Sequence, residues 1–283
     1  AQARPGSSIE DVRDYHHVFQ GFAIKAPPSA LAAIKATPGV EGAFVEGRHA
    51  LVNDIDFWGI QDGQNSDNAP AMGTASQMTR ANRAALAGEG QVVEVIDTRF
   101  DTSHEAFAGT VDAASLRLTK DAVATVTGQL GAGKGGAWVS DKIPFAYDYA
   151  DNDADVVPAS EKDLNHGTHV TAIAAANGGE VRGSAPNAQI VVAKVIQDAD
   201  GVMSDAAMLA ALDDALVIKP DVINISLGDD SGMSSDAGSV FAGVYEKLAA
   251  AGITVNAAGG NAFSNAYGNN SGQNKPFATD PDT

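Results

Sequence analysis

Residues 165–177 read NHGTHVTAIAAAN, in which two histidines three positions apart are followed by small residues with high helix propensity. Asn165 is a residue type that commonly caps a helix, so His166 is expected at the N-terminal end of that helix. A histidine held there suits general-base chemistry, because its pKa lies near neutrality. The alternative is that His166 and His169 are only polar residues at a helix start. The rest of the sequence has to decide between these two interpretations.

Composition excludes several classes of function. The 283 residues carry 36 acidic and 18 basic side chains, a formal net charge of −18. Nucleic acid is therefore not an expected partner, because phosphate binding needs a basic surface. The chain has no cysteine, which excludes disulfides, thiolate catalysis and cysteine-bound zinc. Hydrophobic residues make up 44%, enough for a substantial core, and no apolar run is long enough to form a membrane span.

Apolar segments alternate with amphipathic ones from residue 92 onward. Strands are expected at 92–96, 190–195, 222–225 and 253–256, and helices after His166, at 204–218 and at 236–250. Strands that are apolar nearly throughout and separated by helices indicate a parallel sheet covered on both faces. The predicted fold class is therefore α/β.

Polar or glycine-rich turns follow three of these strands. They are Asp97, Ser226-Leu227-Gly228 and Gly259-Gly260-Asn261. The carboxyl ends of parallel strands meet at one edge of a sheet, where functional groups gather. The sequence therefore predicts one functional rim.

The first 50 residues carry a separate pattern. A strand is expected at 18–25, a short helix at 30–36 and a second strand at 40–45. This β-α-β unit is too small to hold a core of its own, so we expect it to dock on the larger part. Residues 112–158 show few periodic signals and are interpreted as a long insertion on the rim.

Four segments resemble, in the same order, motifs of the subtilisin-type serine peptidases (subtilases). They are VIDT at 95–98, HGTHV at 166–170, VINISLG at 222–228 and the segment from Gly252 to Asn261. The resemblance implies a subtilisin-like three-layer fold with a mostly parallel sheet. The stretch from Trp138 to Tyr149 is similar to the cell-envelope branch of the family, which includes lactocepin and C5a peptidase.

The resemblance also implies how the chain is divided. Residues 1–50 resemble the C-terminal part of an inhibitory propeptide, a partial α+β unit. Residues 51–283 resemble the N-terminal portion of a catalytic domain, with the rim insertion at about 112–158. It implies protein or peptide substrates, the chain's own propeptide as a partner, synthesis as a zymogen, and a secreted or cell-wall-associated location in a bacterium.

In this family a serine hydroxyl attacks the peptide bond after a histidine removes its proton. His166 matches that base, Asp97 matches the acid that orients it, and Asn261 matches the oxyanion donor. The segment that lines the substrate cleft and pairs with the peptide as an added strand is matched by Ser226, Leu227, Gly228, Gly259 and Gly260.

Two features depart from the family pattern. Arg99 stands where the family usually has glycine, and we expect it either to pair with Asp97 or to close part of the cleft. The acidic loop 151–155 resembles the start of a calcium loop, but Val156 and Lys162 replace the glycine and glutamate that such a loop needs. A solvated acidic loop is therefore favoured, no metal site is predicted, and calcium remains possible for the family.

The family's nucleophile lies in a Gly-Thr-Ser-Met-Ala segment well after the oxyanion asparagine. Only 22 residues follow Asn261, and none of them forms this motif, so the nucleophilic serine is not expected in this chain. The isolated chain is expected to be inactive, with a sheet incomplete at its C-terminus. It would be a fragment of a longer protease, a catalytically dead protein-binding homologue, or one chain of a split enzyme.

The rival class is a nucleotide-binding α/β protein. It requires G-x-G-x-x-G after the first strand, whereas this chain has DTRFD at 97–101. The sequence therefore favours the peptidase interpretation.

Overall fold

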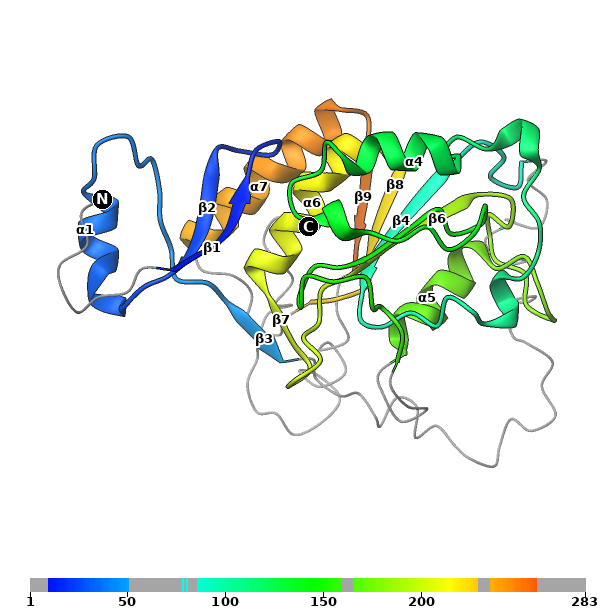
Figure 1. Cartoon of the computed structure of the whole chain (residues 1–283), viewed down its shortest axis with the longest axis horizontal. Helices are drawn as coiled ribbons and strands as arrows, with labels where there is room; N and C mark the ends of the chain where they lie inside the picture. Colours follow the sequence, from blue (N-terminus) through cyan, green and yellow to red (C-terminus); the bar gives the residue numbers. More distant parts are fainter. Residues whose placement is uncertain are drawn as a thin grey trace.

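A parallel sheet forms the centre of the molecule (Figure 1). The computed structural model describes residues 10–50, 78, 80, 86–158, 165–228 and 235–258. Five strands lie in the order β5-β6-β4-β8-β9, and every neighbouring pair is parallel. Their bounds are β5 Phe145–Asp148, β6 Gln189–Lys194, β4 Val92–Asp97, β8 Val222–Ile225 and β9 Thr254–Ala257. The predicted α/β class with a parallel sheet is confirmed.

Helices cover both faces of this sheet. They are α4 (Lys120–Thr127), α6 (Asp205–Ile218) and α7 (Ser235–Ala250) on one face, and α5 (His166–Ala175) on the other. Side chains of β4 alternate between the two, since Ile96 packs into the core with α6 whereas Val95 packs into the core with α5. The three-layer arrangement is therefore confirmed.

Local sequence signals place α6 well. The Ser204 hydroxyl accepts a hydrogen bond from the Ala207 amide at 3.2 Å, which caps the helix as predicted. At the other end Lys219 adopts a left-handed conformation, with φ of 57°, before Pro220. The helix is buried along most of its length because it lies between the sheet, α7 and the N-terminal residues.

The N-terminal residues differ from the predicted β-α-β unit. Strand β1 (Glu10–Tyr15) pairs antiparallel with β2 (Gly21–Lys25), followed by the 3-10 turn η1 (Pro28–Ala30) and α1 (Leu31–Lys35). The second strand predicted at 40–45 is wrong, because those residues have no regular structure and Val45 is 68% exposed. Apolar residues alone do not make a strand when no partner strand lies beside them.

A different segment forms the next strand. β3 (Arg48–Ala50) pairs antiparallel with β7 (Val202–Ser204), the strand that leads into α6. Figure 1 shows this pair at the lower side of the molecule, where β3 extends from the N-terminal part toward the main body. Among the described residues, 10–50 contact the larger part at β7, α6 and α7.

The segment 112–158 contains more of the fold than a rim insertion. Strand β5 lies in it, forms the edge of the central sheet and is buried along its whole length. Its short sequence, FAYD, has too few β-branched residues to signal a strand. Two short 3-10 turns also lie in this segment, η4 (Ala113–Ser115) and η5 (Gly133–Gly135), and a third, η3 (Glu105–Phe107), precedes it. In the described part of the chain, no helix combines the length and apolar character that a membrane crossing needs.

Candidate active site

Two residues 69 positions apart in the sequence meet at the edge of the sheet. Asp97 is the last residue of β4 and His166 is the first residue of α5, and Asp97 Oδ1 lies 2.8 Å from His166 Nδ1. The Asp97 side chain is fully buried, whereas that of His166 is 36% exposed. The geometry therefore places a shielded carboxylate behind an imidazole that solvent reaches.

The segment after β4 holds the start of α5 in place. Thr98 Oγ1 accepts a hydrogen bond from the Gly167 amide at 2.9 Å, and Thr168 Oγ1 accepts one from the Asp101 amide at 2.8 Å. Gly167 has no room for a side chain, because a Cβ there would lie 2.8 Å from the Arg99 carbonyl oxygen. Close approach of the two backbones therefore requires glycine in the His-Gly-Thr motif.

Asn165 occupies the predicted N-cap position, but its side chain makes no capping hydrogen bond. Thr98 provides a side-chain acceptor for the first turn instead. This role was not predicted, because it depends on a contact between segments far apart in the sequence.

The carboxylate sets the protonation of the imidazole. The hydrogen bond from His166 to Asp97 raises the pKa of His166, and partial burial opposes this rise. One Asp97 oxygen also accepts the Thr98 amide at 2.7 Å, and the other, Oδ2, is buried without a hydrogen-bond partner among the described residues. Burial and the nearby His166 lower the pKa of His169. His166 therefore has the features of a base, whereas His169 is exposed and its lowered pKa favours the neutral form.

Arg99, the departure from the expected glycine, turns toward another carboxylate. Its guanidinium lies 2.9 Å from Asp198 Oδ1, in the loop between β6 and β7. The Arg99 side chain is only 11% exposed. One expectation was that Arg99 pairs with Asp97. The observed ion pair is instead with Asp198, and Asp97 Oδ1 is occupied by His166 and the Thr98 amide. The other expectation, that Arg99 closes part of the cleft, stays a prediction.

The acidic loop contributes to an ion cluster around a buried lysine. The Lys194 ammonium, at the end of β6, binds Asp148, Asp151 at 3.2 Å and Asp198 at 2.8 Å. Burial disfavours charge on this lysine, but its hydrogen bonds to the aspartates outweigh that effect and raise its pKa. The three carboxylates have the spacing of metal ligands, and Lys194 supplies a positive charge among them. Asp151 is therefore held in a cluster, while Asp153 and Asp155 remain exposed as expected for a solvated loop.

The predicted cleft-lining residues are only partly described. Ser226, Leu227 and Gly228 follow β8, whose Ile225 is paired with Ile96 of β4, so they lie at the same edge of the sheet as Asp97. Ser226 Oγ accepts a hydrogen bond from Asn224 Nδ2 at 2.9 Å. Gly259, Gly260 and Asn261 lie outside the described residues, so their roles remain predictions.

One strand that pairs with the segment after this loop has no sequence signal. Strand β3 pairs with β7, which follows the loop that carries Asp198, the partner of Arg99. Arg48, His49 and Ala50 alternate in no hydrophobic pattern that would have indicated a strand. Only the pairing identifies them.

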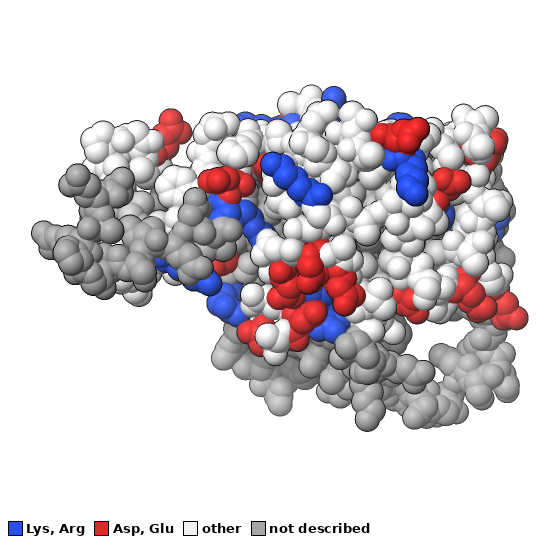
Figure 2. Space-filling model, in the orientation of Figure 1, with Lys and Arg blue, Asp and Glu red and all other residues white. Residues whose placement is uncertain are grey.

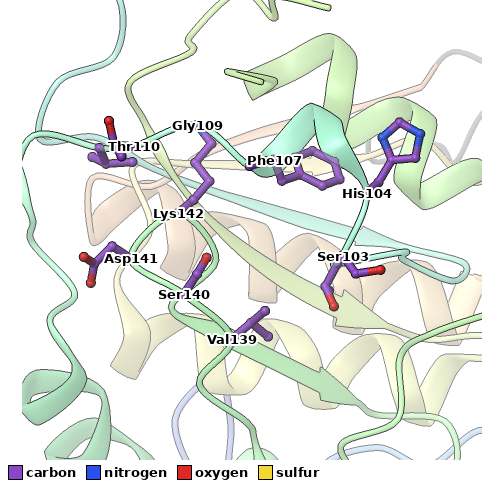
Figure 3. Close-up of a pocket in the computed structure, with 12 residues that line it drawn as sticks. Ser103, His104, Phe107, Gly109, Thr110, Val139, Ser140, Asp141 and Lys142 are labelled. Atoms are coloured by element: carbon purple, nitrogen blue, oxygen red, sulfur yellow. The ribbon is translucent and has the colours of Figure 1, made fainter. Parts of the chain in front are cut away.

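A separate cavity of about 400 Å³ lies between residues 102–111 and 139–142 (Figure 3). Two of the residues that line it, His104 and Lys142, have titratable side chains, and both side chains form hydrogen bonds with the backbone. His104 Nδ1 accepts the Ala106 amide at 3.1 Å, and Lys142 Nζ donates to the carbonyls of Pro186 and Ala188 at 2.8 and 2.6 Å. Neither Asp97 nor His166 lines this cavity, so it is distinct from the Asp97–His166 site.

Comparisons with known proteins agree with this geometry. A family model described as "Subtilase family" matches residues 88–281. A PII-type proteinase of Lacticaseibacillus paracasei is 37% identical over 153 residues, 51% of this chain and 8% of the relative. A C5a peptidase of Streptococcus pyogenes serotype M6 is 32% identical over 162 residues, 54% of this chain and 13% of the relative.

Two further similarities extend over more of the chain. A subtilisin-like protease of Arabidopsis thaliana is 26% identical over 272 residues, 90% of this chain and 34% of the relative. A crystal structure of a cold adapted subtilisin-like serine proteinase matches with a TM-score of 0.40 and 26% identity, covering 63% of this chain and 50% of that chain. The chain thus spans from 8% to 34% of the length of these three curated relatives.

Proposed function

The chain belongs to the subtilase family, and from this premise we propose that it carries the general base and the orienting acid of a serine endopeptidase. The observation that carries the proposal is the 2.8 Å contact between buried Asp97 and half-exposed His166. This contact brings together, at one edge of the sheet, two of the sequence motifs that resemble the family.

The geometry supports a definite division of roles. When His166 Nδ1–H donates to Asp97, the other ring nitrogen, Nε2, is an acceptor that takes the proton of a serine hydroxyl. Asp97 then stabilises the imidazolium that forms, because the two groups are already hydrogen-bonded and Asp97 is shielded from water. The proposed reaction needs no cofactor, since base, acid and oxyanion donor are all side chains.

The remaining parts of the apparatus are proposed from the family resemblance. Asn261 would donate its amide to the developing oxyanion, and Ser226, Leu227 and Gly228, with Gly259 and Gly260, would hold the peptide substrate. No Gly-Thr-Ser-Met-Ala segment occurs in the 283 residues. We therefore propose that the nucleophilic serine lies outside them and that this chain alone does not hydrolyse peptides.

We further propose that residues 10–50 act as an inhibitory propeptide, so that the protein is made as a zymogen. Two contacts support this proposal: β3 lies along β7, and the amides of His17 and Val18 each donate to Asp213 of α6 at 2.7 Å. A strand bound beside β7 would occupy the place of an extended peptide substrate. The resemblance to the cell-envelope branch supports a secreted or cell-wall-associated location.

A fluorophosphonate probe, which labels activated serines, tests the proposal. The gene product that contains residues 1–283 should be labelled at one serine outside them, and the 283-residue chain should not be labelled. His166→Ala should lower peptide hydrolysis by the gene product at least about 10³-fold, because the serine loses its base. The matched control, His169→Ala, should keep most of the activity.

Two results would contradict the proposal. Strong labelling of the 283-residue chain would place the nucleophile within it. Unchanged proteolysis after His166→Ala would remove the catalytic role of that histidine.

A further inference from the structure

The segment that includes β3 is held beside β7 by a carboxylate. The surface of β7 and Asp205 that this segment covers is termed the groove. Asp205, the first residue of α6, lies directly after β7, and its side chain is only 4% exposed. Asp205 Oδ1 lies 3.0 Å from His49 Nε2, and Oδ2 accepts the Gly47 amide at 2.6 Å. One buried carboxylate thus binds a backbone amide and an imidazole two residues apart.

Burial makes this contact energetically significant. The His49 side chain is 11% exposed, so both partners are largely shielded from water. Hydrogen bonds to a shielded charged group contribute more than those at a surface, and removing one partner leaves the other buried and unpaired. A side chain without an N–H donor at the position of His49 would therefore bind poorly.

The contact between His49 and Asp205 also restricts the residue two positions before His49. A Cβ on Gly47 would lie 2.5 Å from His49 Nε2 and 2.9 Å from Asp205 Oδ2. Any larger residue would thus disturb the contact that Asp205 makes. Glycine is required here by close approach.

The residue between them faces the other way. Arg48 reaches Asp200 Oδ2 at 2.8 Å and Gln197 Oε1 at 2.9 Å, and the Arg48 and Asp200 side chains are 56% and 46% exposed. An exposed ion pair of this kind contributes little. Arg48 therefore adds a weak preference, and Asp205 makes the main selection. Figure 2 shows a dense group of acidic side chains near the middle of the visible face, beside the position that β7 occupies in Figure 1.

We propose that Asp205 is a specificity-determining residue, and that the groove beside β7 selects extended peptides with glycine followed two residues later by histidine. The inference rests on the proposed function, because it treats the groove as a peptide-substrate site. The proposed substrates are peptides with a Gly-x-His segment, and a basic residue at x strengthens their binding further. β3 itself, with the sequence Gly47-Arg48-His49, is the chain's own copy of such a peptide.

Hydrogen exchange in the 283-residue chain tests the contact without any need for catalysis. His49→Ala should raise the exchange rate of the Gly47 amide and the β3 amides about tenfold or more, because docking of the strand weakens. Asp205→Asn should raise it similarly, and His49→Ala added to Asp205→Asn should have less than about a twofold further effect. Asp121→Asn, a change of an exposed acid on α4, is the matched control and should leave exchange unchanged. Independent, additive effects would overturn the proposal.

Peptide binding then tests selectivity. Fluorescent peptides EGRHAL and EGRAAL are titrated against the His49→Ala chain, whose own strand is weakened, and anisotropy is measured. The histidine peptide should bind about tenfold more tightly, and this preference should disappear in the Asp205→Asn, His49→Ala chain. Equal affinities, binding of neither peptide, or a preference that survives Asp205→Asn would overturn the inference.

The two proposals fail separately. If the exchange and binding results hold but the gene product cleaves no peptide, the groove is a selective binding site and the endopeptidase proposal fails. If proteolysis depends on His166 but not on a Gly-x-His segment, the endopeptidase proposal stands and the role of Asp205 falls.

Discussion

Asp97 and His166 show how much of the site's chemistry depends on single residues. The carboxylate is fully buried and the imidazole is 36% exposed, so their hydrogen bond lies between the core and solvent. A bond in this position is stronger than a surface ion pair, because water competes with it on one side only. The same contact supports both the basicity of His166 and the attachment of α5 to β4.

Asp97→Asn should lower the pKa of His166. The hydrogen bond to Asp97 is the main cause of the raised pKa, and burial, which remains in the variant, acts in the opposite direction. The pKa should therefore fall from above the usual value of about 6.5 to below it. Histidine titration by NMR measures this, with His166→Gln to assign the signal and Asp198→Asn as the control.

The same pair predicts a dependence of stability on pH. Because the folded-state pKa of His166 is raised, the pair stabilises the fold fully below about pH 6.5 and loses this contribution as the pH rises through the folded-state pKa. Asp97→Asn should therefore cost more stability at pH 5 than at pH 9. An equal loss at both pH values would contradict the assignment.

Lys142 should make the stability depend on pH in the opposite direction to the Asp97–His166 pair. Burial lowers its pKa to about 7, so the unfolded chain binds more protons than the folded one from about pH 7 to its ordinary pKa near 10.4. Stability should rise with pH across this window, by at most about 1.4 kcal/mol per pH unit. Urea unfolding at pH 7, 8 and 9 should show this rise in the natural chain and its loss in Lys142→Met. The exposed Lys120→Met is the control, and a rise that persists in Lys142→Met would exclude Lys142 as its source.

At the scale of elements, β4 combines Asp97 with an unusual buried carboxyl group, that of Glu94. Glu94 lies on the face that meets α6, is 0% exposed, and neither of its carboxyl oxygens has a hydrogen-bond partner among the described residues. Burial, reinforced by Asp214 on α6, raises the pKa of Glu94 well above its usual range. Glu94 therefore keeps its proton to a higher pH in the folded chain than an ordinary glutamate does.

Glu94→Gln should stabilise the chain at neutral and higher pH. The unfolded chain ionises Glu94 above about pH 4.3, whereas the folded chain keeps the proton to a higher pH, so stability falls as the pH rises above that value. Glutamine has nearly the same shape and cannot ionise, so the gain in unfolding free energy should reach at least about 1 kcal/mol at pH 8. Urea unfolding at pH 5 and pH 8 measures it, with the exposed Glu246→Gln on α7 as the matched control. A gain that does not grow with pH would contradict the buried, protonated state.

At the scale of the whole molecule, the N-terminal hairpin is attached through charged groups. Asp213 accepts amide hydrogen bonds from His16, His17 and Val18, and Lys247 of α7 donates to the Val18 carbonyl. Arg13 of β1 donates to the Ala206 carbonyl at 3.0 Å. Buried hydrogen bonds to a carboxylate are specific in direction, so they fix where the hairpin docks on α6 and α7.

Asp213→Ala should loosen this attachment while leaving the sheet intact. Three amides lose their acceptor, one of them in a buried hydrogen bond, which should cost about 2–4 kcal/mol of docking free energy. Hydrogen exchange should increase in residues 10–25 and 48–50 and stay unchanged in β4, β6 and β8. Asp236→Asn, which removes the exposed ion pair with Lys35, is the control and should have little effect. Uniformly faster exchange would instead indicate global destabilisation.

The sequence predicted much of the fold because its signals are local. Apolar runs at 92–96, 190–195 and 222–225 match β4, β6 and β8 within one residue, and Ser204 caps α6 as expected. The strand predicted at 18–25 corresponds to β2. Strands β1, β3 and β5 were missed for the same reason, since short, polar or weakly patterned segments become strands only when a partner lies beside them.

By itself, the sequence determined the α/β class, the parallel sheet and the two residues that meet at its edge, because periodicity and motif order are properties of the chain. The tertiary structure decided what those residues face. Thr98 caps α5, Arg99 binds Asp198, and Asp205 holds His49, all through contacts between segments far apart in the chain. Such contacts follow from burial and close packing, which no local pattern encodes.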